Sequence, residues 1–141
     1  MMVSARHLAS LKYGNAGRLL AFKLNGELTL PRLDLLEKVI PEQPLLQSTE
    51  FQISRGTELY GEYCAFCHGT AVRAGPALPD LRMMSNDSHE LFKEIVYEGI
   101  LSENGMSSFS DVLSENDVES IYHYIVKTAT VDRQIQLEQN N

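Results

Sequence analysis

The chain has 141 residues, of which 43% are hydrophobic and 22% are charged, and its formal net charge is −7. This length and composition predict one folded domain with short appendages and argue against a disordered chain. The acidic balance excludes nucleic acid as a natural partner, because phosphates demand a basic surface. No run of about 18 apolar residues occurs, so the sequence predicts no transmembrane segment.

Residues 1–30 contain a hairpin signal. An Asn25-Gly26 pair separates two apolar runs, residues 18–24 and 27–30. Such a pair between two apolar runs is typical of the tight turn that joins antiparallel strands. We therefore expect a short β-hairpin in this N-terminal arm.

Residues 31–50 are rich in proline. Pro31, Pro41 and Pro44 surround a short apolar stretch, and prolines this frequent interrupt regular structure. The sequence predicts an extended linker here, with at most one short helix.

Three helices are predicted in the remainder of the chain. The first begins near Ser54, whose hydroxyl can cap free amides, and runs to Cys64. The second begins at Asp87, in a capping-box pattern, and ends at Gly99. The third begins at Ser114 and is amphipathic. Its apolar stripe consists of Val118, Ile121, Tyr122, Ile125, Val126 and Ala129.

The segment 64–68, Cys-Ala-Phe-Cys-His, carries the most specific chemistry in the chain. Two thiols three residues apart, followed at once by an imidazole, have the spacing of a covalent c-type haem attachment. Each sulfur can add to one vinyl group of the porphyrin, and the adjacent histidine reaches the iron from the same side. The sequence therefore predicts one covalent haem c, with His68 as an iron ligand.

The opposite axial ligand has one favoured candidate. Met106 follows Gly105 in a flexible loop between two predicted helices, where the backbone can bring sulfur to iron. Met83 and Met84 follow His68 too closely for the chain to cross easily to the other haem face. The remaining candidates are Met1, Met2 and His7 in the N-terminal arm, His89 and His123 on predicted helices, and several lysines.

Other interpretations of the motif remain open. If Met106 is not a ligand, the iron has an open position, as in a peroxidase or a gas sensor. Cys64, Cys67 and His68 can instead be part of a zinc site, but no second Cys/His pair stands at a suitable spacing. The cysteines can also form a thioredoxin-like dithiol, although the βαβ context of that fold is missing.

The residues resemble a class I cytochrome c domain over about residues 51–130. The closest likeness is to the C-terminal haem domain of PQQ-dependent quinohaemoprotein alcohol dehydrogenases. The resemblance is carried by Gly56, Leu59, Tyr60, Cys64, Cys67, His68, Gly69, Pro79-Asp80-Leu81-Arg82, Gly105-Met106 and the last helix.

The resemblance implies an all-α fold, with about three main helices and loops around one covalent haem, preceded by the hairpin and linker. It assigns the cytochrome c domain to residues 51–132 and leaves residues 133–141 as a polar tail. Residues 1–30 would then be an arm left over from a propeller blade.

The resemblance also implies a role for each site residue. Cys64 and Cys67 form the thioethers, and His68 and Met106 ligate the iron. The carbonyl of Pro79 accepts the other ring N–H of His68, which fixes the orientation of the imidazole.

Three further positions bear on these implied roles. Arg82 faces a haem propionate, its alternative being a solvated surface arginine. Pro76 is the rival of Pro79 for the carbonyl contact. Ser107 departs from the family pattern, in which proline commonly follows the methionine, and this puts the stiffness of the loop in doubt.

Iron with two protein ligands has no open site for substrate, so the predicted function is one-electron transfer and not catalysis. By resemblance, electrons come from a PQQ dehydrogenase domain, and PQQ and calcium belong to that missing domain. They leave to a cytochrome, a blue-copper protein or a quinone pathway. The alternative is a stand-alone soluble respiratory cytochrome c. Haem attachment of this type predicts a periplasmic location, although residues 1–12 lack the features of a secretory signal.

Overall fold

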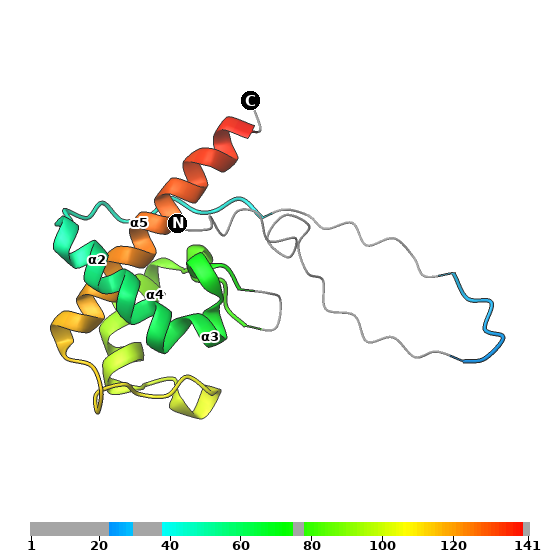
Figure 1. The fold of residues 1–141 in the computed structure, drawn as a ribbon, viewed down its shortest axis with the longest axis horizontal. Coiled ribbons are helices and arrows are strands. Elements are labelled where there is room, and N and C mark those ends of the chain that lie inside the picture. Colours follow the sequence, from blue (N-terminus) through cyan, green and yellow to red (C-terminus); the bar gives the residue numbers. More distant parts are fainter. Residues whose placement is uncertain (1–22, 30–37, 75–77, 140–141) are drawn as a thin grey trace.

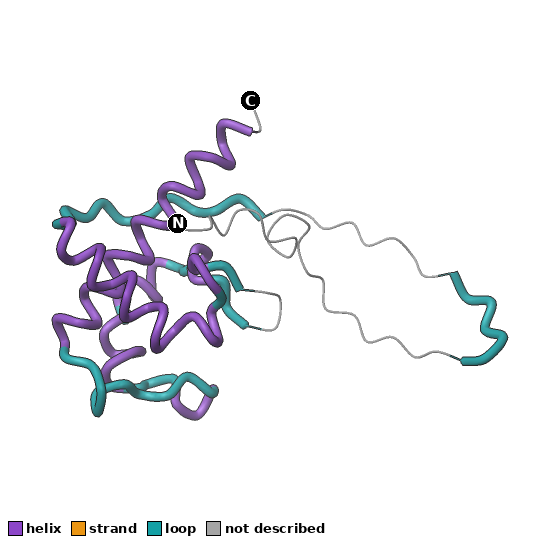
Figure 2. Tube along the Cα trace, in the orientation of Figure 1, coloured by secondary structure: helices purple, strands orange, loops and turns teal. Residues whose placement is uncertain are grey.

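The computed structural model describes residues 23–29, 38–74 and 78–139, and within these ranges every regular element is helical (Figures 1 and 2). The predicted all-α fold class is confirmed at this level. The α-helices are α2 (Glu50–Leu59), α3 (Ala65–His68), α4 (Asn86–Glu90) and α5 (Glu115–Gln139). Short π-helical turns cover Tyr60–Cys64 and Glu94–Glu98, and 3-10 turns cover Thr70–Val72, Leu81–Met83 and Ser102–Asn104. None of the described helices is both long and apolar enough to cross a bilayer.

The helix starts differ in part from the predicted ones. α2 begins at Glu50, not near Ser54, because Thr49 and Gln52 form a reciprocal capping box. α4 is capped by Ser85, whose hydroxyl accepts from the amide of Ser88. The predicted start of the third helix is confirmed, since the Ser114 hydroxyl accepts from the amide of Asp117.

α2 and α5 cross at very short range and form the centre of the domain (Figure 1). A Cβ atom added at Gly56 would lie 2.0 Å from the carbonyl oxygen of Ser120, so only glycine permits this approach. The predicted stripe of α5 lies in the core, although Tyr122 is only half-buried. Residues from the other segments pack with it, namely Leu59, Tyr60, Val72, Phe92, Val96 and Leu113.

The predicted β-hairpin is not supported. The turn itself exists: Asn25 has a positive φ of 62°, and the amide of Gly26 donates to the carbonyl of Lys23. Residues 23–29 form no strand, however, and Leu24 and Leu28 are 88% and 87% exposed. Two strands need a hydrophobic surface to pack on, and these leucines have none. The rest of the predicted hairpin lies outside the described residues.

Residues 38–48, which we name the strap, form no helix but are bound along α5 (Figure 2). Ile40 is 3% exposed, its amide donates to Oε1 of Gln136, and its carbonyl accepts from Nη1 of Arg133 at 2.6 Å. Ser48 Oγ lies 2.6 Å from Nδ1 of His123. This part of the predicted linker is therefore attached to the helical domain by specific contacts.

Candidate functional site

His68 ends helix α3 and is buried, and contacts with two neighbouring residues hold its ring and its backbone. Its Nδ1 lies 3.0 Å from the carbonyl oxygen of Pro79. The hydroxyl of the buried Tyr60 donates to the carbonyls of His68 and Gly69 at 3.2 and 2.8 Å. The side chain and the backbone of His68 are thus both held in place.

The contact with Pro79 decides which ring nitrogen of His68 is free. A carbonyl oxygen only accepts hydrogen bonds, so Nδ1 carries the proton and Nε2 of the neutral imidazole keeps its lone pair. A lone pair at Nε2 is what a metal requires. The residue is therefore prepared to ligate iron, which is the geometry that its predicted role needs.

The two cysteines differ in exposure. Cys64 is buried at the end of a π-helical turn, while Cys67 is exposed, and both are free thiols. Burial, with the nearby Cys67, raises the pKa of Cys64 to about 11, so this thiol is protonated at neutral pH. Phe66, between them, is 97% exposed. A large exposed aromatic beside the motif fits a surface that a porphyrin would cover.

Met106 lies in the loop after the 3-10 turn Ser102–Asn104. Gly105 before it has a φ of 93°, and an added Cβ there would meet open space. The methionine is half-buried beside the hydrophobic core, and its amide donates to the carbonyl of Leu101. Met84 also packs against the core. The thioether of Met106 suits a haem together with the His68 imidazole, and its ligation stays a prediction.

Arg82 makes contacts that the sequence did not predict. Its guanidinium forms two hydrogen bonds with Asp80, at 2.9 and 2.5 Å, and a third with Asp132 at 3.2 Å. Asp132 in turn receives a bidentate contact from Arg73. A propionate contact of Arg82 therefore stays a prediction, and any such contact would share the guanidinium with two carboxylates.

Asp132 and Arg73 were missed by the sequence analysis. One signal was available, because Asp132 follows Ala129 at helical spacing and so continues the apolar stripe of α5. A carboxylate at a stripe position is expected to be buried and paired. The identity of the partner, Arg73, depends on tertiary structure.

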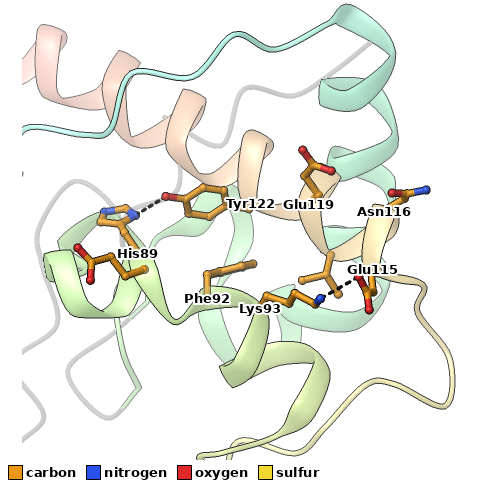
Figure 3. Close-up of a pocket in the computed structure, with 9 residues that line it drawn as sticks. His89, Phe92, Lys93, Glu115, Asn116, Glu119 and Tyr122 are labelled. Atoms are coloured by element: carbon orange, nitrogen blue, oxygen red, sulfur yellow. Dashed lines mark hydrogen bonds and ion pairs between the residues drawn. The ribbon is translucent and has the colours of Figure 1, made fainter.

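A separate pocket lies between α4 and α5, and of the candidate haem ligands only the less favoured His89 lines it (Figure 3). Nδ1 of His89 lies 3.1 Å from the hydroxyl of Tyr122, whose ring packs on Phe92 with the centroids 4.9 Å apart. Lys93 forms an ion pair with Glu115 at its rim. The histidine thus acts in the packing of α4 on α5.

Residues 51–125 match the family described as cytochrome c oxidase, cbb3-type, subunit III. This segment includes the Cys-Ala-Phe-Cys-His motif and the α2–α5 crossing, and the chain belongs to this family of cytochrome c domains. A cytochrome c domain of this kind is an electron-transfer module.

Several relatives of this chain are named as alcohol dehydrogenases. The quinohemoprotein alcohol dehydrogenase ADH IIB of Pseudomonas putida is 39% identical over 79% of this chain and 16% of its own length. The dehydrogenase subunit of the alcohol dehydrogenase (quinone) of Acetobacter aceti is 30% identical over 90% of this chain and 17% of its own length. The solved structure of ADHIIG from Pseudomonas putida HK5 matches with a TM-score of 0.64 and 33% identity, over 81% of this chain and 16% of that one. The chain thus spans about one sixth of the length of these relatives.

Proposed function

We propose that the chain binds one haem c through Cys64 and Cys67, with His68 and Met106 as axial ligands. The observation that carries the proposal is the contact between His68 Nδ1 and the Pro79 carbonyl, which leaves Nε2 available on the residue next to Cys67. When bound, a haem with two protein ligands supplies a one-electron redox change with no open position for substrate.

The contribution of the chain's own residues is to fix the position of the proposed iron ligand His68. Tyr60 fixes the backbone at His68, and the Pro79 carbonyl fixes the imidazole ring. Little movement of the ligands is then needed when the charge of the iron changes, which favours fast electron transfer. Cys64 lies on the buried side of the motif, and Cys67 and Phe66 lie on the exposed side, which the haem would cover.

The proposal extends to the electron donor and acceptor. Two of the relatives are quinohemoprotein alcohol dehydrogenases of Pseudomonas putida, and this chain matches about a sixth of their length. Electrons would come one at a time from the PQQ of a dehydrogenase domain. They would pass to a cytochrome, a blue-copper protein or a quinone pathway in the bacterial periplasm.

The ligands are tested by maturing the full chain with a c-type haem attachment system and comparing Met106→Ala with Met83→Ala. Met83 is a matched control, since it is also a half-buried methionine near the site. We expect M106A to lose the weak red absorption band of ferric methionine ligation and to bind carbon monoxide when reduced. M83A should retain the band and resist carbon monoxide. Loss of the band in M83A alone would overturn the assignment.

The covalent attachment is tested with the double variant Cys64→Ala and Cys67→Ala. Its pigment should extract into acidified organic solvent, whereas that of the wild-type chain should remain with the protein. A wild-type chain that is colourless after maturation, or that binds zinc in place of iron, would refute the proposal.

The relay is tested by rapid mixing of the oxidised, matured chain with ADH IIB truncated to its dehydrogenase part and then with alcohol. Reduction of the haem, followed by absorbance, should require both the alcohol and the dehydrogenase part. If this mixture stays oxidised while a respiratory quinol oxidoreductase reduces the chain rapidly, the stand-alone carrier is the correct function.

A further inference from the structure

A four-residue ionic network lies beside the proposed haem site. Its members alternate in charge, in the order Arg73, Asp132, Arg82 and Asp80. Asp132 accepts from Nε and Nη2 of Arg73 at 2.8 and 2.6 Å, and from Nη1 of Arg82 at 3.2 Å. The Asp132 side chain is 7% exposed, and the arginines are each 18% exposed. One buried carboxylate of α5 therefore holds two arginines from another part of the chain.

These two arginines stand on either side of Pro79. Arg73 lies a few residues after His68, where the chain turns so sharply that a Cβ at Gly69 would lie 2.0 Å from the carbonyl oxygen of Arg73. Asp80 is the neighbour of Pro79 in the sequence, and Arg82 binds the Asp80 carboxylate through two side-chain contacts. The Pro79–Asp80 segment is thus attached to Asp132 through Arg82, and Arg73 is the second partner that holds the Asp132 carboxylate in place.

We propose that Asp132 is a positioning residue for His68, which it orients through Arg73, Arg82 and the carbonyl of Pro79. The inference rests on the proposed function, because it concerns the residue that would ligate iron. With the carbonyl held 3.0 Å from Nδ1, the imidazole shares its proton with the carbonyl and becomes more electron-donating. A more electron-donating ligand favours the oxidised iron and so lowers the reduction potential.

A purely structural role is the alternative, and stability alone does not distinguish the two. A buried ion pair is weak support for stability, since desolvation of the ions offsets their attraction. Breaking the network would nevertheless destabilise the fold, because the remaining charges lose their partners. The test therefore needs a readout that reports on the imidazole itself.

The test compares Asp132→Asn and Arg73→Gln in the matured, haem-bound chain, by reduction potential. Loss of a carboxylate raises the potential by simple charge, and loss of a guanidinium lowers it. Loss of positioning raises the potential in both variants, because the contact at Nδ1 weakens. We expect both variants to raise it, each changing the ratio of oxidised to reduced protein at a fixed potential about threefold or more.

A second measurement follows the Nδ1 proton of His68 by NMR in the reduced protein. Its exchange with solvent should become about tenfold faster or more in both variants, as expected when an outer partner of a metal ligand is disturbed. If D132N does not accumulate, R73Q is sufficient for the test. The direction in which R73Q shifts the reduction potential distinguishes positioning, which raises it, from charge, which lowers it. A lowered potential in R73Q, or unchanged proton exchange, would overturn the proposal.

Asp117→Asn is the matched control. Asp117 is also on α5 and is also paired with an arginine, Arg55, but this pair lies at the other end of the helix. D117N should lower the melting temperature without changing the exchange of the His68 proton. A wild-type chain that takes up no covalent haem refutes the proposed function. A normal holoprotein in which R73Q lowers the potential refutes only the positioning role.

Discussion

The two halves of α5 make contacts of different kinds, although they belong to one continuous helix (Figure 1). The first half packs against α2 and the core through the apolar side chains of Val118, Ile121 and Ile125. The second half uses polar side chains to hold extended segments. Asp132 binds the loop around Pro79, while Arg133 and Gln136 bind the backbone of the strap.

The difference teaches what each kind of contact requires. Apolar packing between helices needs a stripe at the right period and a small residue at the crossing. An irregular segment has unpaired backbone groups, and these must find donors and acceptors when they are buried. The second half of α5 provides them, so it can hold segments that have no regular structure of their own.

The largest loss of stability should come from Gly56→Ala, which places a methyl group in the α2–α5 crossing. The new Cβ would meet the Ser120 backbone at 2.0 Å, so the helices must separate. We expect the free energy of unfolding to fall by about 3 kcal/mol, as for an overpacked core. Denaturant unfolding of the matured chain, followed by circular dichroism, measures this loss.

Gly61→Ala is the control for this variant. A Cβ at Gly61 has no described atom within 4 Å, so the change should alter stability by about 1 kcal/mol or less. Equal unfolding midpoints for G56A and G61A would show that the crossing is not as tight as the structure has it.

Ile40→Ala tests how the strap is bound to the second half of α5. Ile40 is 3% exposed, so its truncation should lower the free energy of detaching the strap from α5 by about 2 kcal/mol. Proteolytic cleavage within the strap should become correspondingly faster. Leu45→Ala removes a side chain that is fully exposed, and its cleavage rate should match the wild type. Equal rates in the two variants would mean that the strap is not held by Ile40.

The first turn of α5 should make stability depend on acid pH. The Ser114 hydroxyl, which donates to Asp117 at 2.7 Å, holds the pKa of Asp117 below its usual value, with help from Arg55. A depressed pKa gives stability that is present above the ordinary value of about 4 and is lost as pH falls through the folded value. Asp117→Asn should therefore be about 1 kcal/mol less stable at neutral pH.

The check on this prediction is the difference in melting temperature between wild type and D117N as pH falls. It should shrink below about pH 4, where the wild-type carboxylate takes up a proton. A difference that is constant with pH would exclude the contribution of the charged form.

The smallest effect should come from His89, where α4 packs on the first half of α5. Burial lowers the pKa of His89, so the folded state favours the neutral ring. The associated stability is complete above the unfolded pKa of about 6.5 and is lost as pH falls through the lower folded value. The wild type should lose a few tenths of a kcal/mol over this range. His89→Gln should lack this slope, and an identical slope in thermal unfolding would show that another group titrates.

Much of the helical domain could be predicted because its signals are local. The cysteine and histidine spacing lies within one short segment, and the α5 stripe repeats at the helical period. The start of α2 was misplaced, since Ser54 and Thr49 are both plausible caps and only Thr49 has a reciprocal partner in Gln52. The hairpin was wrong because a turn signal says nothing about what the strands pack on.

The contacts around Asp132 and the strap could not be predicted in the same way. Much of the strap's attachment uses backbone carbonyl and amide groups, which every residue has, and its side-chain contacts at Ile40 and Ser48 follow no regular period. Arg73 and Asp132 are far apart in the sequence, and their pairing depends on how α5 passes the loop. Residues such as Pro79 were named only through the resemblance to a family.

The bound strap also sets the reach of this module. Lys38 is fixed beside Gln136, so any chain that precedes it departs from the second half of α5. If the chain is joined to a dehydrogenase domain, as proposed, the residues of the bound strap add nothing to the length of the connecting segment, and a shorter connection confines the module to a smaller volume around that domain. In that arrangement, release of the strap would lengthen the connecting segment, so that the module could reach more distant acceptors but would have a lower local concentration near the proposed donor.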